Sequence, residues 1–342
     1  MDLRKVALLA AVAVVLSGSA ALRAQDNRDV QIGVQQTVTI NVGGKPISGQ
    51  VDLARNVVYI KSEGLPLAGS KGAQARWTAK ESAVLYAARN LLLMTVGMWM
   101  EGRMSAAEGR LIESKVAAAF KGAVKTGKIY DDPKKNHGPL PDDLASSLGW
   151  QADEFDPNDG IFTVVMEAPF AGAGSVSAAM CTPSVSQQVH QALGNMAEAH
   201  PEAKVELQDV PMDTRALAPS AGATTGVIVD CRGLGLRVAL NPKVFKGDAP
   251  IYGSQVNTNA AVERGIAGYI SAGDYEKYTK GDAAVARIVK ERVGASPMTV
   301  KAAEAKGTKS VALSAEDADK MVAANEKGHF FERLAVMFVI NE

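Results

Sequence analysis

Near its start the chain alternates apolar and polar residues in short runs. Residues 36–42 read Gln-Thr-Val-Thr-Ile-Asn-Val, and this period of two residues predicts a strand with one buried face. Two further short strands are expected at residues 47–53 and 56–62, joined by a turn. Glycine, proline and serine in residues 64–72 then predict a loop.

Helical spacing follows this loop. Thr78 and Glu81 have the spacing of a capping box, so a helix is expected to begin at Thr78. Small apolar residues, mostly alanines, then recur on one stripe, which would let the helix lie close to a sheet. Ser105 and Glu108 repeat the cap signature before a second predicted helix over residues 106–121.

The middle of the chain is less regular. Residues 131–159 are rich in proline, aspartate and glycine and predict an excursion on the surface. Asp159-Gly160 is a hairpin-turn signal, and a strand is expected after it at residues 161–168. A helix over residues 186–200 and a polar linker follow.

The last third again mixes strands and helices. The expected elements are strands at residues 225–231 and 236–240, a turn at Asn241-Pro242, a strand at residues 300–305, a helix capped by Ser314 with Asp317 and ending at Gly328, and a strand at residues 334–340. Strands and helices interleave without a regular βαβ period, which predicts an α+β fold rather than a doubly wound α/β fold. In the first domain the alanine-rich helix is expected to pack on a short antiparallel sheet.

The strand that begins at residue 225 is predicted to be the core of the second domain. Val227 and Val229 point to one face and Ile228 to the other, so both faces are largely apolar, as in a central strand covered on both sides. Glycines bracket this strand, which suits tight turns or a close approach of backbones. Asp230 and Arg232 share a face at its end and predict a structural ion pair.

The first 24 residues have the layout of a secretory leader. Arg4 and Lys5 precede an apolar run over residues 6–16, and small residues follow. An apolar run of this length rises about 16 Å as a helix, roughly half of the hydrocarbon core of a bilayer. We therefore expect a cleavable signal peptide, cut after Ala24 or after Ala21, and a periplasmic protein without a transmembrane segment.

Five segments are expected along the chain. They are a signal peptide at residues 1–24, an N-terminal strand segment at 25–46, an α+β domain at 47–183 with a surface excursion at 131–153, a helix and linker at 184–224, and a C-terminal α+β domain at 225–342.

Composition adds limits on partners and on redox chemistry. The 37 basic and 37 acidic residues balance, and without a basic block the chain has no electrostatic footprint for nucleic acid or for an anionic membrane surface. Cys181 and Cys231 are the two cysteines. In an oxidising compartment they are a disulfide candidate, but the apolar run before Cys231 suits a buried free thiol equally well. Both alternatives stay open.

Catalytic motifs are missing from the sequence. Neither a zinc-protease helix, a nucleophile elbow nor a phosphate loop is present, and the four histidines are scattered. Gly233-Leu234-Gly235 lacks the third glycine of a dinucleotide loop. The acidic cluster around Asp156 has phenylalanine and methionine where an EF-type calcium loop needs oxygen ligands. We expect no enzymatic activity, no cofactor and no metal.

Two segments resemble known exported bacterial proteins. Residues 51–59, the loop, the helix with its Ala-Ala-Arg-Asn-Leu-Leu run and the strand of residues 159–166 resemble one envelope module. It occurs in small outer-membrane lipoproteins and in the N-terminal domain of flagellar assembly protein T. Residues 225–234 resemble the "Thr-Gly-Leu-Ile-x-Asp-Ala-Arg-Gly-Leu" signature of related proteins. The matching motif positions are Gly226, Asp230, Arg232, Gly233 and Pro242.

This resemblance covers roughly residues 47–342, and it has three departures. Cys231 stands where the signature has alanine, residues 131–153 are an insertion, and the chain has no lipid-acceptor cysteine near the leader. The resemblance implies a non-enzymatic structural or assembly factor of the cell envelope, whose partners are unidentified envelope proteins. The alternative is a periplasmic module that binds a small ligand or peptidoglycan in a cleft between the two domains.

Overall fold

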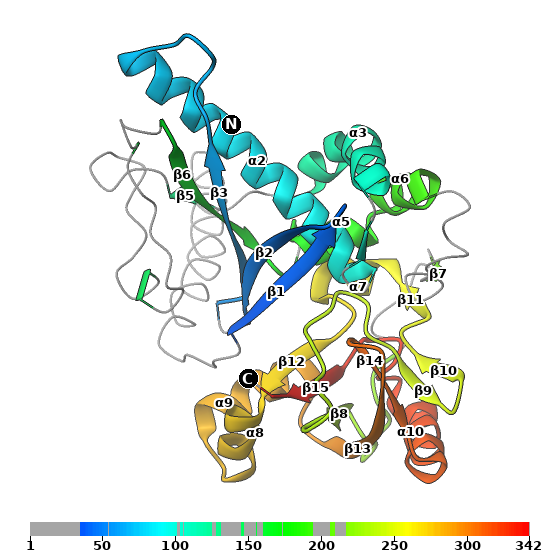
Figure 1. Ribbon diagram of the computed structural model, residues 1–342. Coiled ribbons are helices and arrows are strands. Elements are labelled where there is room, and N and C mark those ends of the chain that lie inside the picture. Colours follow the sequence, from blue (N-terminus) through cyan, green and yellow to red (C-terminus); the bar gives the residue numbers. More distant parts are fainter. Residues whose placement is uncertain are drawn as a thin grey trace, which may run out of the picture.

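The computed structural model describes residues 35–53, 55–100, 103–104, 106–124, 128–130, 145–146, 155, 160–172, 174–193, 206–208 and 217–341. These residues form two large β-sheets with packed helices and a separate sheet of two short strands (Figure 1). The α+β fold predicted from the sequence is confirmed. The leader and most of the 131–153 excursion lie outside the described residues.

The first sheet has six strands in the order β4-β1-β2-β3-β6-β5. They are β1 (Gln35–Val42), β2 (Lys45–Asp52), β3 (Val57–Gly64), β4 (Arg103–Met104), β5 (Lys128–Tyr130) and β6 (Phe162–Pro169). Neighbours are antiparallel except for the two-residue pairing of β4 with β1. Residues 35–46 therefore belong to this sheet, because β1 pairs with β2 along its full length.

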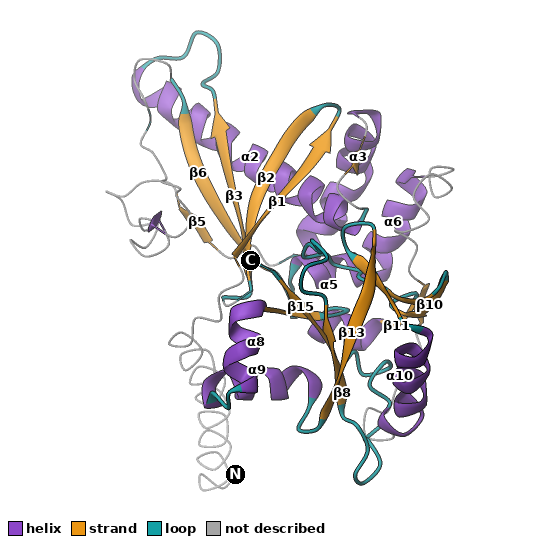
Figure 2. Cartoon of the chain, turned by 60° about the horizontal axis from the view of Figure 1, so that its bottom comes forward, coloured by secondary structure: helices purple, strands orange, loops and turns teal. Residues whose placement is uncertain are grey.

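Helix α2 (Gly72–Trp99) crosses one face of the first sheet (Figure 2). Its alanine stripe is buried, and a side chain at Gly64 would collide with the backbone of Ala79 and Ala83. The predicted close approach of helix and sheet is confirmed. The predicted start at Thr78 is wrong: α2 begins six residues earlier, and the Thr78 hydroxyl donates to the carbonyl of Gln74 instead of capping.

Three shorter helices are described in full in the first half. They are α3 (Ala106–Ala123), α5 (Val176–Cys181) and α6 (Pro183–Leu193). Helix α6 packs on α3. The helix expected at residues 186–200 begins earlier, at Pro183, because proline fits the first helical position, where its missing N–H costs no hydrogen bond. Its expected last residues lie outside the described part of the chain.

The second sheet has seven strands in the order β10-β9-β14-β13-β8-β15-β12. They are β8 (Gly226–Asp230), β9 (Val244–Lys246), β10 (Ala249–Tyr252), β12 (Gly268–Ser271), β13 (Pro297–Lys306), β14 (Ser310–Leu313) and β15 (Val336–Ile340). Strand β8 is parallel to both of its neighbours, and β15 is parallel to β12. The helices are α7 (Thr258–Arg264), α8 (Ala272–Thr279), α9 (Ala283–Val293) and α10 (Ala315–Gly328).

Both faces of β8 are covered, as the sequence predicted. Ile228 packs with α8 and α9 in one apolar cluster, while Val227 and Val229 belong to the main core on the other face. The cap of α10 is also confirmed, since the Ser314 hydroxyl accepts from the N–H of Asp317 at 3.1 Å.

The strand predicted at residues 236–240 is wrong. These residues are mostly buried but form no sheet ladder. The Gln36 side chain accepts from the N–H of Val238 at 2.5 Å, and the Tyr269 hydroxyl contacts both the N–H and the carbonyl of Ala239. Side chains thus satisfy backbone groups that a neighbouring strand would otherwise satisfy.

One hydrophobic core runs through both halves, from Val38 in β1 to Ile340 in β15. A short parallel pair, β7 (Glu206–Gln208) with β11 (Gln255–Asn257), forms a third sheet of its own. Among the described residues, every helix is too short or too polar to cross a bilayer.

Candidate functional site

The Asp230–Arg232 pair lies at the carboxyl end of the central strand β8. The Arg232 guanidinium donates to both carboxylate oxygens, at 2.9 Å from Nε and 2.6 Å from Nη2, and the Arg232 N–H adds a third bond. The same guanidinium lies 5.3 Å from the ring centre of Tyr275. Hydrogen bonding from Arg232 lowers the pKa of Asp230, with its charge and that of Lys301 adding to the effect. The predicted ion pair is confirmed.

This edge is where open sheets with parallel strands commonly bind ligands. Strands β8, β15 and β12 all end here, and Lys301 of β13 is the register partner of Asp230. A second ion pair, Asp274 with Lys277, follows β12 at 2.8 Å. The charged groups of the edge are therefore largely matched to one another, although Arg232 keeps a side-chain exposure of 38%.

The opposite end of β8 is held by close packing. A side chain at Gly226 would collide with the carbonyl of Val293 and come within 2.7 Å of that of Ala335. The Thr225 hydroxyl donates to the same Val293 carbonyl at 2.9 Å. Gly226 and Asp230 are four steps apart along a strand, or about 13 Å. The motif positions found in the sequence thus do not form a single site.

Two other motif positions have backbone roles. Gly233 has a φ of 84° in the turn after β8, a conformation that glycine adopts without strain. Pro242 lies against Gly253, where a side chain would collide with the Pro242 carbonyl. No helix follows the Gly233-Leu234-Gly235 turn, so it offers no helix N-terminus for a phosphate.

A cluster of three arginines, which the sequence did not indicate as a unit, surrounds the Gly226 end of β8. Arg264 donates to the carbonyls of Glu291 and Arg292 at the end of α9. Arg292 donates to the carbonyls of Arg264, Gly265 and Val336. Burial lowers the pKa of Arg292 to about 10.

The third arginine completes this arrangement. Arg333 donates to the carbonyls of Gly328 and His329 at the end of α10 and to that of Thr225 before β8. The arginine cluster thus places positive charge at the carboxyl ends of three helices, where helix dipoles favour cations. Its bonds go to main-chain carbonyls, which is the arrangement of a structural clamp.

The two cysteines are free, buried thiols. Of the two alternatives left open by the sequence, the structure has the unpaired one. Burial raises the pKa of Cys181 to about 12, and burial together with the charge of Asp230 does the same for Cys231. Such thiols are poor nucleophiles at neutral pH.

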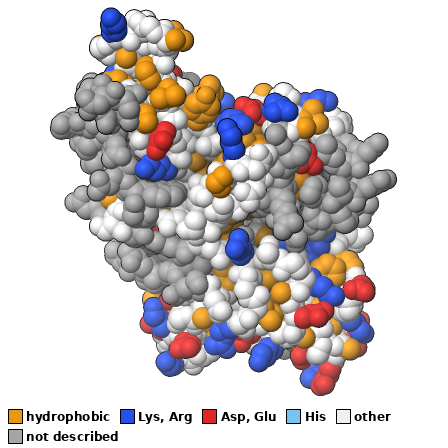
Figure 3. All heavy atoms as spheres, in the orientation of Figure 1, with side chains coloured by type: hydrophobic (Ala, Val, Ile, Leu, Met, Phe, Trp, Pro, Cys, Tyr) orange, Lys and Arg blue, Asp and Glu red, His pale blue; other side chains and the backbone are white. Residues whose placement is uncertain are grey.

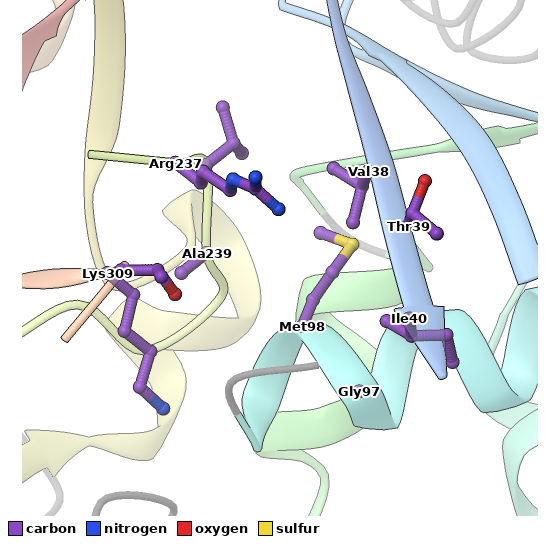
Figure 4. Close-up of a pocket in the computed structure, with 10 residues that line it drawn as sticks. Val38, Thr39, Ile40, Gly97, Met98, Arg237, Ala239 and Lys309 are labelled. Carbon is purple, nitrogen blue, oxygen red and sulfur yellow. The ribbon is translucent and has the colours of Figure 1, made fainter. Parts of the chain in front are cut away.

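A small cavity lies between the two halves. Figure 4 shows Arg237 and Ala239 on one side of it and Val38, Ile40 and Met98 on the other. Its volume is about 40 Å³, well under the roughly 300–1,000 Å³ of small-molecule sites. The cavity has room for water but does not match the ligand cleft that the sequence alternative required.

Metal ligands do not gather anywhere in the described part of the chain, where no three His, Cys, Asp or Glu side chains share a site. The acidic residues around Asp156, and His137 and His200, lie outside that part. His329 is described, and it ends α10 with a left-handed backbone.

In comparison with known proteins, one family model matches part of the chain. Residues 226–342 match a family described as the second domain of Treponema pallidum Tp0624. The matched segment begins at the first residue of β8 and includes all seven strands of the second sheet. No curated protein matches the chain.

Proposed function

We propose that this protein is a non-enzymatic structural or assembly factor of the bacterial cell envelope, exported to the periplasm by a cleavable leader. The proposal depends on one observation: the ionisable groups around β8 are bonded to other groups of the fold. The arginine cluster binds main-chain carbonyls, and Asp230 binds Arg232. These groups serve the fold, and both cysteines are buried among apolar side chains.

Two further observations support the location. The first 24 residues have the layout of a leader. The segments quoted in the sequence analysis resemble the module of small outer-membrane lipoproteins and of the N-terminal domain of flagellar assembly protein T. The resemblance of residues 225–234 to exported proteins concerns the same segment at which the Tp0624 match begins.

Cross-linking in intact cells tests the proposed role. The protein is recovered from cross-linked envelopes, and its neighbours are identified by mass spectrometry. We expect stable protein neighbours, and we expect them unchanged in an Arg232→Gln variant, because that pair serves the fold. Recovery without any protein neighbour would contradict an assembly role. Mass spectrometry of the native N-terminus tests export: Gln25 or Leu22 is expected first, and an intact Met1 would contradict cleavage.

A second candidate function, binding of a small ligand or peptidoglycan, is favoured by one observation. Arg232 is partly exposed at the edge where parallel strands end. If this edge binds the cell wall, Arg232→Gln should abolish retention on isolated sacculi while leaving thermal melting nearly unchanged. The structural interpretation predicts the reverse, with a lower melting temperature and unchanged retention.

A further inference from the structure

A lysine is buried where the two halves of the molecule meet. By the first half we mean residues 35–193, with the first sheet, and by the second half residues 217–341, with the second sheet. Figure 3 shows lysine and arginine side chains scattered over the visible surface. Lys309, directly before β14, is different, because only 2% of it is exposed. Lysine is rarely buried so fully unless its charge is paired or hydrogen-bonded, so its partners indicate its role.

The Lys309 ammonium bonds to both halves. It donates to the carbonyl of Trp99 at 2.6 Å and to the side-chain oxygen of Asn241 at 3.0 Å. Trp99 is the last residue of α2, where the main-chain carbonyls have no partner within the helix and the helix dipole favours a cation. One buried ammonium thus joins the end of α2 in the first half to a loop of the second half.

Both sides of this contact are held within their own halves. In the second half, the N–H of Arg237 donates to the carbonyl of Thr308 at 2.7 Å, which ties the loop to the turn that carries Lys309. In the first half, the end of α2 lies close to β1, where a side chain at Gly97 would collide with Ile40. The ammonium therefore connects two elements that are each fixed to a sheet.

Packing beside this contact is incomplete. The cavity of about 40 Å³ has Lys309 and Arg237 on one side and Met98 of α2 on the other (Figure 4). The side chains around such a gap lose the van der Waals contacts that a filled space would give. Gln36 of β1 adds a second polar contact between the halves, because it accepts from the N–H of Val238. Contact on this side of the molecule therefore depends largely on hydrogen bonds.

We propose that Lys309 couples the two halves, so that they unfold as one unit. Without the ammonium, the Trp99 carbonyl and the Asn241 oxygen lose a charged donor at a buried position, and water replaces that donor when the halves separate. A state with one half folded and the other unfolded then becomes populated. With the coupling intact, a partner bound to either half stabilises both, because binding to the native state adds to the stability of the whole unit.

Each half contains its own probe of unfolding. Cys181 ends α5 in the first half, Cys231 follows β8 in the second half, and both thiols are buried. In the full chain, a short pulse of alkylating reagent is given at increasing urea concentrations. Peptide mass spectrometry then yields a separate unfolding curve for each cysteine. Tryptophan emission is a second measure of the first half, because the three tryptophans, at positions 77, 99 and 150, precede residue 217.

The curves at Cys181 and Cys231 should have the same midpoint in the wild type. In Lys309→Met, which keeps a side chain of similar length without the charge, the two midpoints should separate by about 0.5–1 M urea. Ile228→Ala is the matched control: it destabilises the second half on the face covered by α8 and α9, so both midpoints should fall together. Lys306→Met, at a partly exposed lysine of the same hairpin, should leave both nearly unchanged.

Three results would overturn the proposal: different midpoints in the wild type, coincident curves in Lys309→Met, or an equal separation in Ile228→Ala. If Lys309→Met does not fold, Asn241→Ala takes its place, because it breaks only the bond of the ammonium to the second half. A smaller separation is expected there, and coincident curves would again overturn the coupling. The proposed assembly role is judged by cross-linking in cells, so either proposal can fail without the other.

Discussion

Replacing Ile228 with alanine tests whether the central strand β8 is packed on both faces. The Ile228 side chain is fully buried against residues of α8 and α9, including Val285 and Val289. The change removes three carbons, worth about 2.4 kcal/mol at roughly 0.8 kcal/mol each. Strand β8 is hydrogen-bonded on both sides and cannot move far into the space that the side chain leaves. The remaining cavity should therefore raise the total loss in the free energy of unfolding to about 3–4 kcal/mol.

Thermal and urea unfolding measure this loss. At roughly 2–4 °C per kcal/mol, the melting temperature should fall by about 6–16 °C. The matched control is Val322→Ala on the exposed side of α10, where a cost within about 0.5 kcal/mol is expected. If the melting temperature of Ile228→Ala equalled that of the wild type, or was no lower than that of the control, the packing of α8 and α9 over this face of the sheet would be refuted.

Three other predictions concern charged and nucleophilic groups. Arg292→Lys should cost about 2–4 kcal/mol in urea unfolding, because an ammonium cannot serve three carbonyls in the fixed geometry of a guanidinium; a cost near zero would refute the clamp. The pKa of Asp230 is lowered from 3.8 in the folded state, so its stabilisation is present above that pH and is lost as the pH falls through the lower folded value. The melting difference between wild type and Asp230→Asn should therefore persist at pH 7 and shrink below about pH 4; a difference that grew on acidification would contradict this sign. Cys181 and Cys231 should both resist a thiol reagent in the native protein and both react in denaturant; failure to react in denaturant without reductant would indicate a disulfide.

Local patterns in the sequence were sufficient for elements whose signals are local. The alternation at β1, the apolar strand at β8 and the Ser314 cap of α10 each depend on residues within a few positions of one another. The alanine stripe of α2 likewise predicted a close helix–sheet contact, because small side chains set how near two backbones can lie.

Local signals were misleading where distant residues compete for the same backbone groups. Thr78 looked like a helix cap, but its hydroxyl bonds the loop at Leu67 and the helix at Gln74, and α2 begins before it. Residues 236–240 looked like a strand, but Gln36 and Tyr269 satisfy that backbone from far away in the sequence. Neither partner is visible within a short window.

By itself the sequence therefore determined the fold class, the central position of β8 and the Asp230–Arg232 pair, since hydrophobic period and short spacing encode them. Only the tertiary structure decided that both cysteines are free, that three arginines meet around one end of β8, and that Leu65, Leu67 and Trp77 stay exposed. The physical reason is the same in each case: pairing and exposure depend on which surfaces fold together, and residues such as Arg264 and Arg333 are brought into contact only by the packing of distant helices.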